Sequence, residues 1–245
     1  MLFFAVLTAG CGAGVDEYKL QVVNSFPHDR GAYTQGLFFR GEHLIESTGQ
    51  FGESTLRVVE LSSGKVLESI SFKNKYFAEG SVISGDALYV LTWMNKVAFV
   101  YDAQTLEYRK AFSYPREGWG LTTDGECLIA SDGSSRLYFM DESFAVLRTV
   151  DVKLNGRPVR NLNELEYIDG KVWANVYLSD VIVVVDPKDG RVCGTVDCTG
   201  LLPSSLRLPD TDVLNGIAYD ASSGKIYLTG KNWPLLYEVR LIPKK

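Results

Sequence analysis

Two ionisable side chains lie in settings that could support proton transfer and stabilise negative charge. Glu79 stands between Phe77-Ala78 and Gly80, which is a tight and partly apolar setting. A carboxyl group against an apolar wall can have a raised pKa and shuttle a proton near neutral pH. Lys231 and nearby side-chain amides could donate hydrogen bonds to a developing oxyanion. Such a set suits an acyl transfer in which the substrate brings its own nucleophile.

Glu79 belongs to a series of short motifs, each of which precedes an apolar strand. The motifs are Thr34-Gln35-Gly36, Ala78-Glu79-Gly80, Gly118-Trp119-Gly120, Leu162-Asn163-Glu164 and Leu214-Asn215-Gly216. Their central residues follow one another at intervals of 44, 40, 44 and 52 residues. A repeat of this length made of short strands is typical of a β-propeller, with one blade for each repeat.

Each repeat predicts four strands separated by turns that are rich in Asp, Ser, Gly and Pro. The fifth repeat ends at Glu238-Val239-Arg240-Leu241-Ile242 without a fourth strand, and the alternating segment 18–24 would supply it. We therefore expect an all-β fold, a five-bladed β-propeller whose ring is closed by an N-terminal strand. Residues 199–212 are expected to form an inserted loop, which explains the long last interval.

In such a blade, the start of the first strand and the end of the second lie on the same face. The candidate site residues should therefore meet at one mouth of the channel: Gln35, Glu79, Trp93, Trp119, Asn163, Tyr177, Asn215, Lys231 and Trp233. Taken singly, the tryptophans could be packing anchors, Lys231 a solvated lysine, and the asparagines caps of strand-start backbone groups. Their shared face favours a small-ligand pocket with aromatic walls and convergent polar groups.

Bulk composition limits the function only broadly. The chain has 245 residues, of which 46% are hydrophobic and 22% charged, and this is ordinary for one all-β domain. The net charge of −5 disfavours nucleic acid as a partner. With only two histidines, His28 and His43, and no Cys-x-x-Cys motif, a zinc site is also disfavoured.

The first residues resemble an export signal. The apolar run Leu2-Phe3-Phe4-Ala5-Val6-Leu7 is too short to span a bilayer and leads to Thr8-Ala9-Gly10-Cys11. This resembles a bacterial lipoprotein cleavage site, with Cys11 as the lipidated residue that would tether the protein to a membrane. No Lys or Arg precedes the run, which departs from the pattern. We expect residues 1–15 to be a leader, 16–245 to be the folded domain, and the protein to be exported to the periplasm or anchored as a lipoprotein.

Seven stretches of the chain together resemble glutaminyl-peptide cyclotransferases (glutaminyl cyclases) of the plant and bacterial type. They are 33–37, 46–52, 77–80, 118–122, 162–166, 214–217 and 229–234, and the resemblance covers about residues 18–245. The resemblance implies a five-bladed propeller enzyme, an aminoacyltransferase that cyclises the N-terminal glutamine of peptides and proteins to pyroglutamate and releases ammonia.

Matching these motifs implies a role for each candidate residue. Glu79 would be the general acid/base, and Gln35, Asn163 and Lys231 would hold the amide and its tetrahedral oxyanion. Trp93 and Trp119 would wall the glutamine side chain, with Tyr177, Asn215 and Trp233 completing the substrate site. The resemblance implies no cofactor for catalysis and allows a structural cation such as Ca²⁺ in the channel.

Two departures from the family pattern bear on the site. Tyr177 stands where the family usually has Trp, and Ala78 stands where it commonly has Gly before the glutamate. Two other functions stay open at this point. A metal-dependent propeller lactonase would need several carboxylate or histidine ligands on the axis, and a non-catalytic propeller would use the aromatic mouth to bind peptides.

Overall fold

In a computed structural model, which describes residues 14–244, the chain forms strands and one short 3-10 helix, η1 (Ser204–Leu206). Three sheets contain four antiparallel strands each, in chain order. The first holds β2 (Thr34–Arg40), β3 (His43–Thr48), β4 (Thr55–Glu60) and β5 (Val66–Ser71). The second holds β6 (Ala78–Ser84), β7 (Ala87–Thr92), β8 (Val97–Asp102) and β9 (Tyr108–Ser113). The third holds β10 (Leu121–Thr123), β11 (Leu128–Ala130), β12 (Arg136–Met140) and β13 (Val146–Asp151).

The rest of the fold is an eight-stranded sheet in the order β16-β17-β18-β19-β1-β22-β21-β20. Its strands are β1 (Asp16–Pro27), β16 (Leu162–Ile168), β17 (Lys171–Val176), β18 (Val181–Val185), β19 (Val192–Asp197), β20 (Leu214–Asp220), β21 (Lys225–Gly230) and β22 (Leu235–Pro243). A small hairpin of β14 (Lys153–Leu154) and β15 (Arg157–Pro158) precedes it. The expected all-β architecture is confirmed, and η1 lies in the expected inserted loop.

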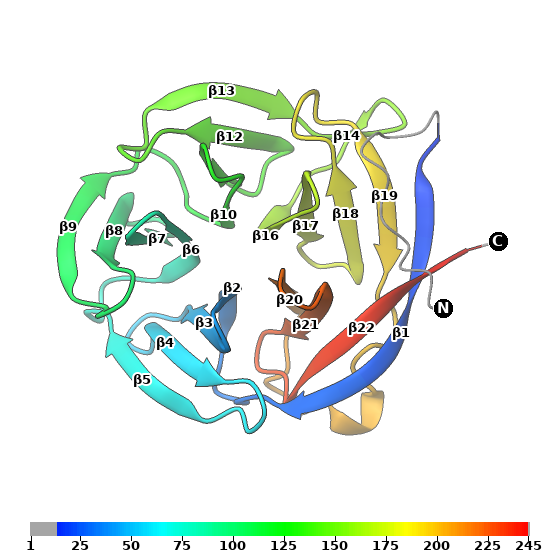
Figure 1. Ribbon diagram of the computed structural model, residues 1–245, viewed down its shortest axis with the longest axis horizontal. Coiled ribbons are helices and arrows are strands. Elements are labelled where there is room, and N and C mark those ends of the chain that lie inside the picture. The colour runs from blue at the N-terminus through cyan, green and yellow to red at the C-terminus, as the bar shows by residue number, and fades with distance from the viewer. Residues whose placement is uncertain (1–13, 245) are drawn as a thin grey trace.

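The N-terminal strand β1 joins the two ends of the chain. It pairs antiparallel with β22, as expected for a strand that completes the last repeat. Its first residues also pair in parallel with β19, from Asp16 opposite Gly194 to Lys19 opposite Asp197. The sequence did not indicate this second pairing, which fuses two neighbouring groups of strands into one sheet. Figure 1 shows β1 running along the rim beside β19 and β22.

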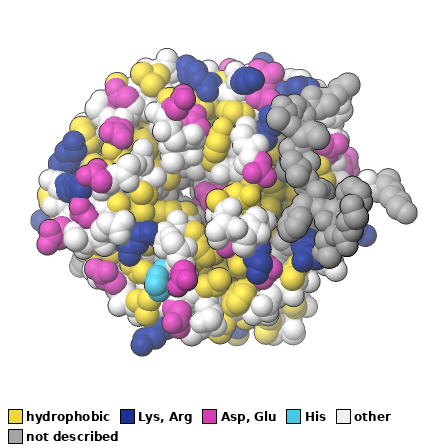
Figure 2. Space-filling model, viewed as in Figure 1, with side chains coloured by type: hydrophobic (Ala, Val, Ile, Leu, Met, Phe, Trp, Pro, Cys, Tyr) yellow, Lys and Arg dark blue, Asp and Glu magenta, His cyan; other side chains and the backbone are white. Residues whose placement is uncertain are grey.

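The sheets surround a central axis, and the fold is propeller-like (Figure 1). The first strands of the successive groups line the axis, and each contacts the next: β2 with β6, β6 with β10, β10 with β16, β16 with β20, and β20 with β2. Seen along the same direction, a narrow opening lies at the centre of the molecule (Figure 2). A ring of first strands thus brings together segments that are far apart in the sequence.

The hydrophobic core of the described residues is divided among the spaces between neighbouring groups of strands. Phe38 and Leu88 belong to the cluster between β2–β5 and β6–β9, and Tyr89 and Leu128 to the one between β6–β9 and β10–β13. Further clusters join β10–β13 to β16–β19, β16–β19 to β20–β22, and β20–β22 back to β2–β5. Burial of apolar side chains between sheets fixes the strands that carry the polar motifs.

Candidate active site

The motifs at the starts of the first strands coincide with irregular strand pairing. Regular register is lost between Thr34 and Gly36 in β2 and between Ala78 and Ser81 in β6. The same break occurs at the corresponding points of β16 and β20. Gln35, Glu79, Asn163 and Asn215 all lie within these breaks. Such irregularities re-aim side chains and are common next to active sites, so they explain how strand residues can point into the channel.

Close backbone contact between neighbouring first strands explains the glycines of the motifs. A Cβ atom at Gly80 would lie 2.6 Å from the carbonyl oxygen of Trp119, and one at Gly120 would lie 2.0 Å from that of Asn163. The Gly80 amide donates a 2.7 Å hydrogen bond to the same Trp119 oxygen. Only glycine fits at these positions, and the strands therefore converge tightly around the axis.

Glu79 is a buried carboxyl group at the centre of the candidate site, with 5% of its surface exposed. Gln35 Nε2 donates a 3.2 Å hydrogen bond to Glu79 Oε1. Burial raises the pKa of Glu79 well above its usual range, the charge of Glu117 raises it further, and Lys231 opposes the rise. A raised pKa favours the protonated carboxyl group, which is a form that can release a proton to a bound substrate.

Lys231 is the buried cationic partner of this site, with 3% of its surface exposed. Its Nζ lies over two aromatic rings, 4.7 Å from the centroid of Tyr33 and 4.8 Å from that of Tyr177. Burial lowers the pKa of Lys231, while Glu79 and Asp212 oppose the change. The solvated-lysine alternative therefore does not describe Lys231. The two aromatic faces fix the position of its N–H donors.

The amide side chains are connected to Glu79 through one another. Asn215 Nδ2 donates to the backbone oxygen of Thr34 at 2.9 Å and to Gln35 Oε1 at 3.2 Å. Gln35 in turn donates to Glu79, so the chain of donors ends on the carboxyl group. Asn163 is also buried, yet within residues 14–244 its Oδ1 has no hydrogen-bond partner. This buried oxygen is an acceptor, and a bound ligand with a hydrogen-bond donor could satisfy it.

Two tryptophans form an aromatic wall held by a single carboxylate. The indole nitrogens of Trp93 and Trp119 both donate to Glu117 Oε2, at 2.9 Å and 3.1 Å. The ring of Trp119 meets the ring of Tyr177 edge to face, with centroids 5.6 Å apart. Tyr177 therefore links this wall to Lys231.

Trp233 is the most deeply buried of the three tryptophans predicted at the site. It lies in the hydrophobic core with 1% of its surface exposed, and its ring packs against Gly230 and Tyr237. Its indole nitrogen donates a 2.9 Å hydrogen bond to the backbone oxygen of Asp212. The indole of Trp233 thus supports the segment that carries Asp212.

Three residues near the site were missed by the sequence analysis: Tyr33, Asp212 and Glu117. Tyr33 donates its hydroxyl hydrogen to Asp212 Oδ2 at 2.7 Å, and burial together with this carboxylate raises the pKa of Tyr33. Tyr33 directly precedes the first motif and Glu117 stands two residues before Trp119, which were the available signals. Asp212 lies in the inserted loop, and its sequence context offered none.

The described residues also show whether side chains group to bind a metal and whether a helix could span a membrane. Within residues 14–244, no group of three or more His, Cys, Asp or Glu side chains could hold a metal ion. The same residues include no helix long and apolar enough to cross a membrane.

Cys127 and Cys198 are free thiols, whereas Cys193 is disulfide-bonded. The expected leader and its Cys11 lie outside the described residues, apart from Gly14 and Val15.

Comparisons with known proteins identify relatives over nearly the whole chain. The sequence profile of the family described as glutamine cyclotransferase matches residues 3–241. Glutaminyl-peptide cyclotransferase of Arabidopsis thaliana is 45% identical over 230 residues, which cover 91% of this chain and 71% of the plant protein.

Solved structures also match the fold of this chain. Glutaminyl cyclase of Myxococcus xanthus superposes with a TM-score of 0.88 at 36% identity, over 94% of this chain and all of that one. A WD40 β-propeller domain of Doa1 is similar in fold alone, with a TM-score of 0.50 and 12% identity over 83% of this chain and 62% of that one. The profile match over nearly the whole chain, with the plant and bacterial relatives, shows that the chain belongs to the glutamine cyclotransferase family of enzymes.

Proposed function

We propose that this protein converts the N-terminal glutamine of peptides and proteins to pyroglutamate with release of ammonia, and that Glu79 is its general acid/base. The observation that carries the proposal is the burial of Glu79, which accepts a hydrogen bond from Gln35 and whose pKa is influenced by the charge of Lys231. Membership of the glutamine cyclotransferase family supports the same reaction.

The reaction needs one proton to move between two nitrogen atoms of the substrate. The neutral α-amine attacks the γ-carboxamide carbon, a C–N bond forms, and the carbonyl oxygen becomes an oxyanion. Ionised Glu79 takes a proton from the attacking amine and then delivers it to the carboxamide nitrogen. The C–N bond to that nitrogen breaks, ammonia leaves, and the five-membered lactam remains.

The other polar residues of the site act on the oxyanion and on geometry. The N–H groups of Lys231, Gln35 and Asn163 would donate to the developing negative charge, and they are already fixed by burial. Asn215 is a positioning residue, because it holds Gln35 through its side-chain amide. Trp93, Trp119 and Tyr177 would hold the glutamine side chain so that its amine lies against its own carboxamide. Such intramolecular attack gains much of its rate from proximity.

The arrangement of the core supports a division of the fold into five blades. The five clusters of described residues each join two neighbouring groups of strands and return to the first group. We propose that β1 contributes the outer strand of the last blade and that residues 16–245 form one cyclotransferase domain. Export and a lipid tether at Cys11 remain predictions of the leader sequence, and mass spectrometry of the mature N-terminus would test both.

The first test is ammonia release from a short peptide with N-terminal glutamine, with and without EDTA. Turnover that resists EDTA is the expected result, since the proposed steps use only side chains of this chain. Failure to release ammonia from several such peptides would overturn the proposal and favour a peptide-binding propeller. Loss of activity with EDTA would favour the metal-dependent alternative, and loss of thermal stability alone would support a structural Ca²⁺.

A further inference from the structure

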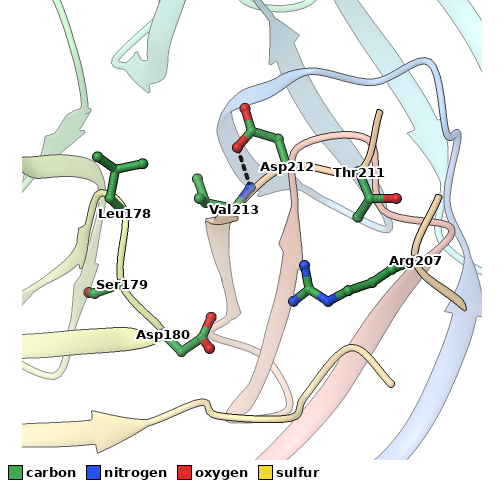
Figure 3. A pocket seen from close by; sticks show the side chains of 7 residues that line it. All are labelled: Leu178, Ser179, Asp180, Arg207, Thr211, Asp212 and Val213. Carbon is green, nitrogen blue, oxygen red and sulfur yellow. Dashed lines mark hydrogen bonds between the residues drawn. The ribbon is translucent and has the colours of Figure 1, made fainter. Parts of the chain in front are cut away.

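A polar pocket of about 290 Å³ lies beside the candidate site (Figure 3). One side is formed by Leu178, Ser179 and Asp180, in the turn after β17. The other side is formed by Arg207 and by residues 211–213, in the inserted loop that ends at β20. None of these residues has a role in the proposed chemistry.

The wall of this pocket is directly joined to the catalytic cluster. Asp212 accepts the hydrogen bond of Tyr33, whose ring lies 4.7 Å from Lys231 Nζ. The backbones of the two segments also pair, because Asp212 N donates to Lys231 O at 3.0 Å and Lys231 N donates to Val213 O at 2.9 Å. On the opposite side, Leu178 directly follows Tyr177, whose ring is the second face over Lys231. A substrate held at Lys231 would therefore have this pocket as a neighbour.

Two opposite charges face the pocket without pairing. Figure 3 shows the carboxylate of Asp180 and the guanidinium of Arg207 pointing into it from opposite sides. Neither side chain forms an ion pair with any residue of the described segment 14–244. The guanidinium of Arg207 lies over the ring of Trp233, with Cζ 5.9 Å from the centroid. Asp212 is different, since its carboxylate accepts from Tyr33 and from the amide of Val213.

We propose that this pocket binds the main chain that follows the N-terminal glutamine of the substrate, with Arg207 donating to a peptide carbonyl and Asp180 accepting from a peptide N–H. A peptide backbone offers an acceptor and a donor close together, which matches a cation and an anion facing each other. A charged side chain of either sign would satisfy only one of the two groups. Leu178 is 68% exposed with a left-handed backbone (φ 64°), and it places an apolar side chain at the rim.

This inference rests on the proposed function and specifies its substrate class: the enzyme distinguishes a glutamine that begins a chain from an isolated glutamine derivative. The test compares kcat/KM for glutaminamide with kcat/KM for a Gln-Ala-Ala amide. Variants Asp180→Ala and Arg207→Met remove the two charges, and methionine keeps an apolar stem over Trp233. Glu142→Ala and Arg240→Met are matched controls, since both residues are exposed and outside the pocket.

The expected result is a loss of about 3- to 10-fold in kcat/KM for the tripeptide in each pocket variant, as for one lost hydrogen bond. The value for glutaminamide should stay unchanged, as should both values in the controls. A set of tripeptides, each N-methylated at one nitrogen after the glutamine, identifies the N–H that Asp180 accepts. Methylation of that nitrogen should lower kcat/KM for the wild type. It should not lower kcat/KM for Asp180→Ala, because the hydrogen bond is already absent in that variant.

The outcomes separate the two proposals. Equal effects on glutaminamide and the tripeptide, or no effect on either, would overturn the subsite and leave the proposed function intact. A lowered thermal midpoint with an unchanged substrate ratio would mean that Asp180 and Arg207 serve stability, which also overturns it. If the wild type turned over neither compound, the proposed function would fail, and the subsite with it.

Discussion

Gln35 donates its side-chain amide hydrogen to Glu79 Oε1 over 3.2 Å, which joins two residues that are 44 positions apart in the sequence. Gln35 belongs to β2 and Glu79 to β6, so the hydrogen bond connects two neighbouring first strands. An uncharged donor to a buried carboxyl group orients it without neutralising it. The orientation and the raised pKa of Glu79 therefore have separate causes, and they can be tested separately.

Replacing Glu79 by Gln should abolish turnover while leaving the fold intact. The amide keeps the volume of the side chain but cannot carry a proton between the amine and the leaving nitrogen, a role that contributes about 10²–10⁴-fold or more. Ammonia release under saturating peptide measures the loss, and the thermal midpoint checks the fold. A near-normal rate would show that Glu79 is not the proton carrier. Glu142→Gln, at an exposed turn, is the control.

Replacing Trp119 by Ala should raise KM for glutamine peptides by about tenfold with a smaller effect on kcat, because the wall that contacts the side chain is lost. Glu117→Ala should act in the same direction, since it releases both indoles from their shared carboxylate. Steady-state kinetics with one peptide measure both. An unchanged KM for Trp119→Ala would assign Trp119 to blade packing.

Replacing Trp233 by Phe should lower stability by about 1–3 kcal/mol without the KM effect expected of a wall residue. The variant keeps an aromatic ring in the core but leaves the backbone oxygen of Asp212 without its indole donor. Urea unfolding monitored by circular dichroism gives the free energy of unfolding. A rise in KM at full stability would return Trp233 to the substrate wall.

The free energy of unfolding should fall as pH rises from about 5 to 9. Burial raises the pKa of Glu166 to about 8, although its side chain also accepts a 3.0 Å hydrogen bond from Tyr219 N. Above pH 4.5, which is the ordinary pKa of this side chain, the unfolded state has lost the proton but the folded state still holds it. This stabilisation is present below that pH and disappears as pH rises through about 8. Urea unfolding at several pH values should show a shallower slope for Glu166→Gln, and an unchanged slope would contradict the assignment.

Replacing Glu46 by Gln should destabilise the fold by about 3 kcal/mol. Glu46 is buried between His28 at 2.9 Å and Arg57 at 3.2 Å, and these partners lower the pKa of Glu46 to about 2 in spite of its burial. The neutral amide would leave His28 without its carboxylate partner and Arg57 with Asp29 as its remaining counterion. Thermal unfolding near neutral pH measures the effect, and Glu42→Gln on an exposed turn is a comparison. A midpoint equal to the wild type would show that the network adds no net stability.

The sequence alone determined the class of fold, the repeating four-strand unit and the pairing of the N-terminal segment with the last strand. Period-two alternation and turn residues such as Asp169-Gly170 are local signals, and local signals specify strands and hairpins. The spacing of the motifs then placed Gln35, Glu79 and Asn215 on neighbouring strands, because equivalent positions in a closed ring must converge.

Only the tertiary structure decided which of these side chains touch and which environment each occupies. Trp233 and Trp119 are the same residue type at one predicted face, yet Trp233 is buried against Gly230, whereas Trp119 is half-buried and donates to the exposed Glu117. Asp212 approaches Tyr33 across 179 positions of sequence, and β1 pairs with β19 in parallel. Such contacts depend on how whole sheets pack and on where the strand register breaks. A pKa depends on burial by all neighbours at once, so no single segment of the sequence contains it.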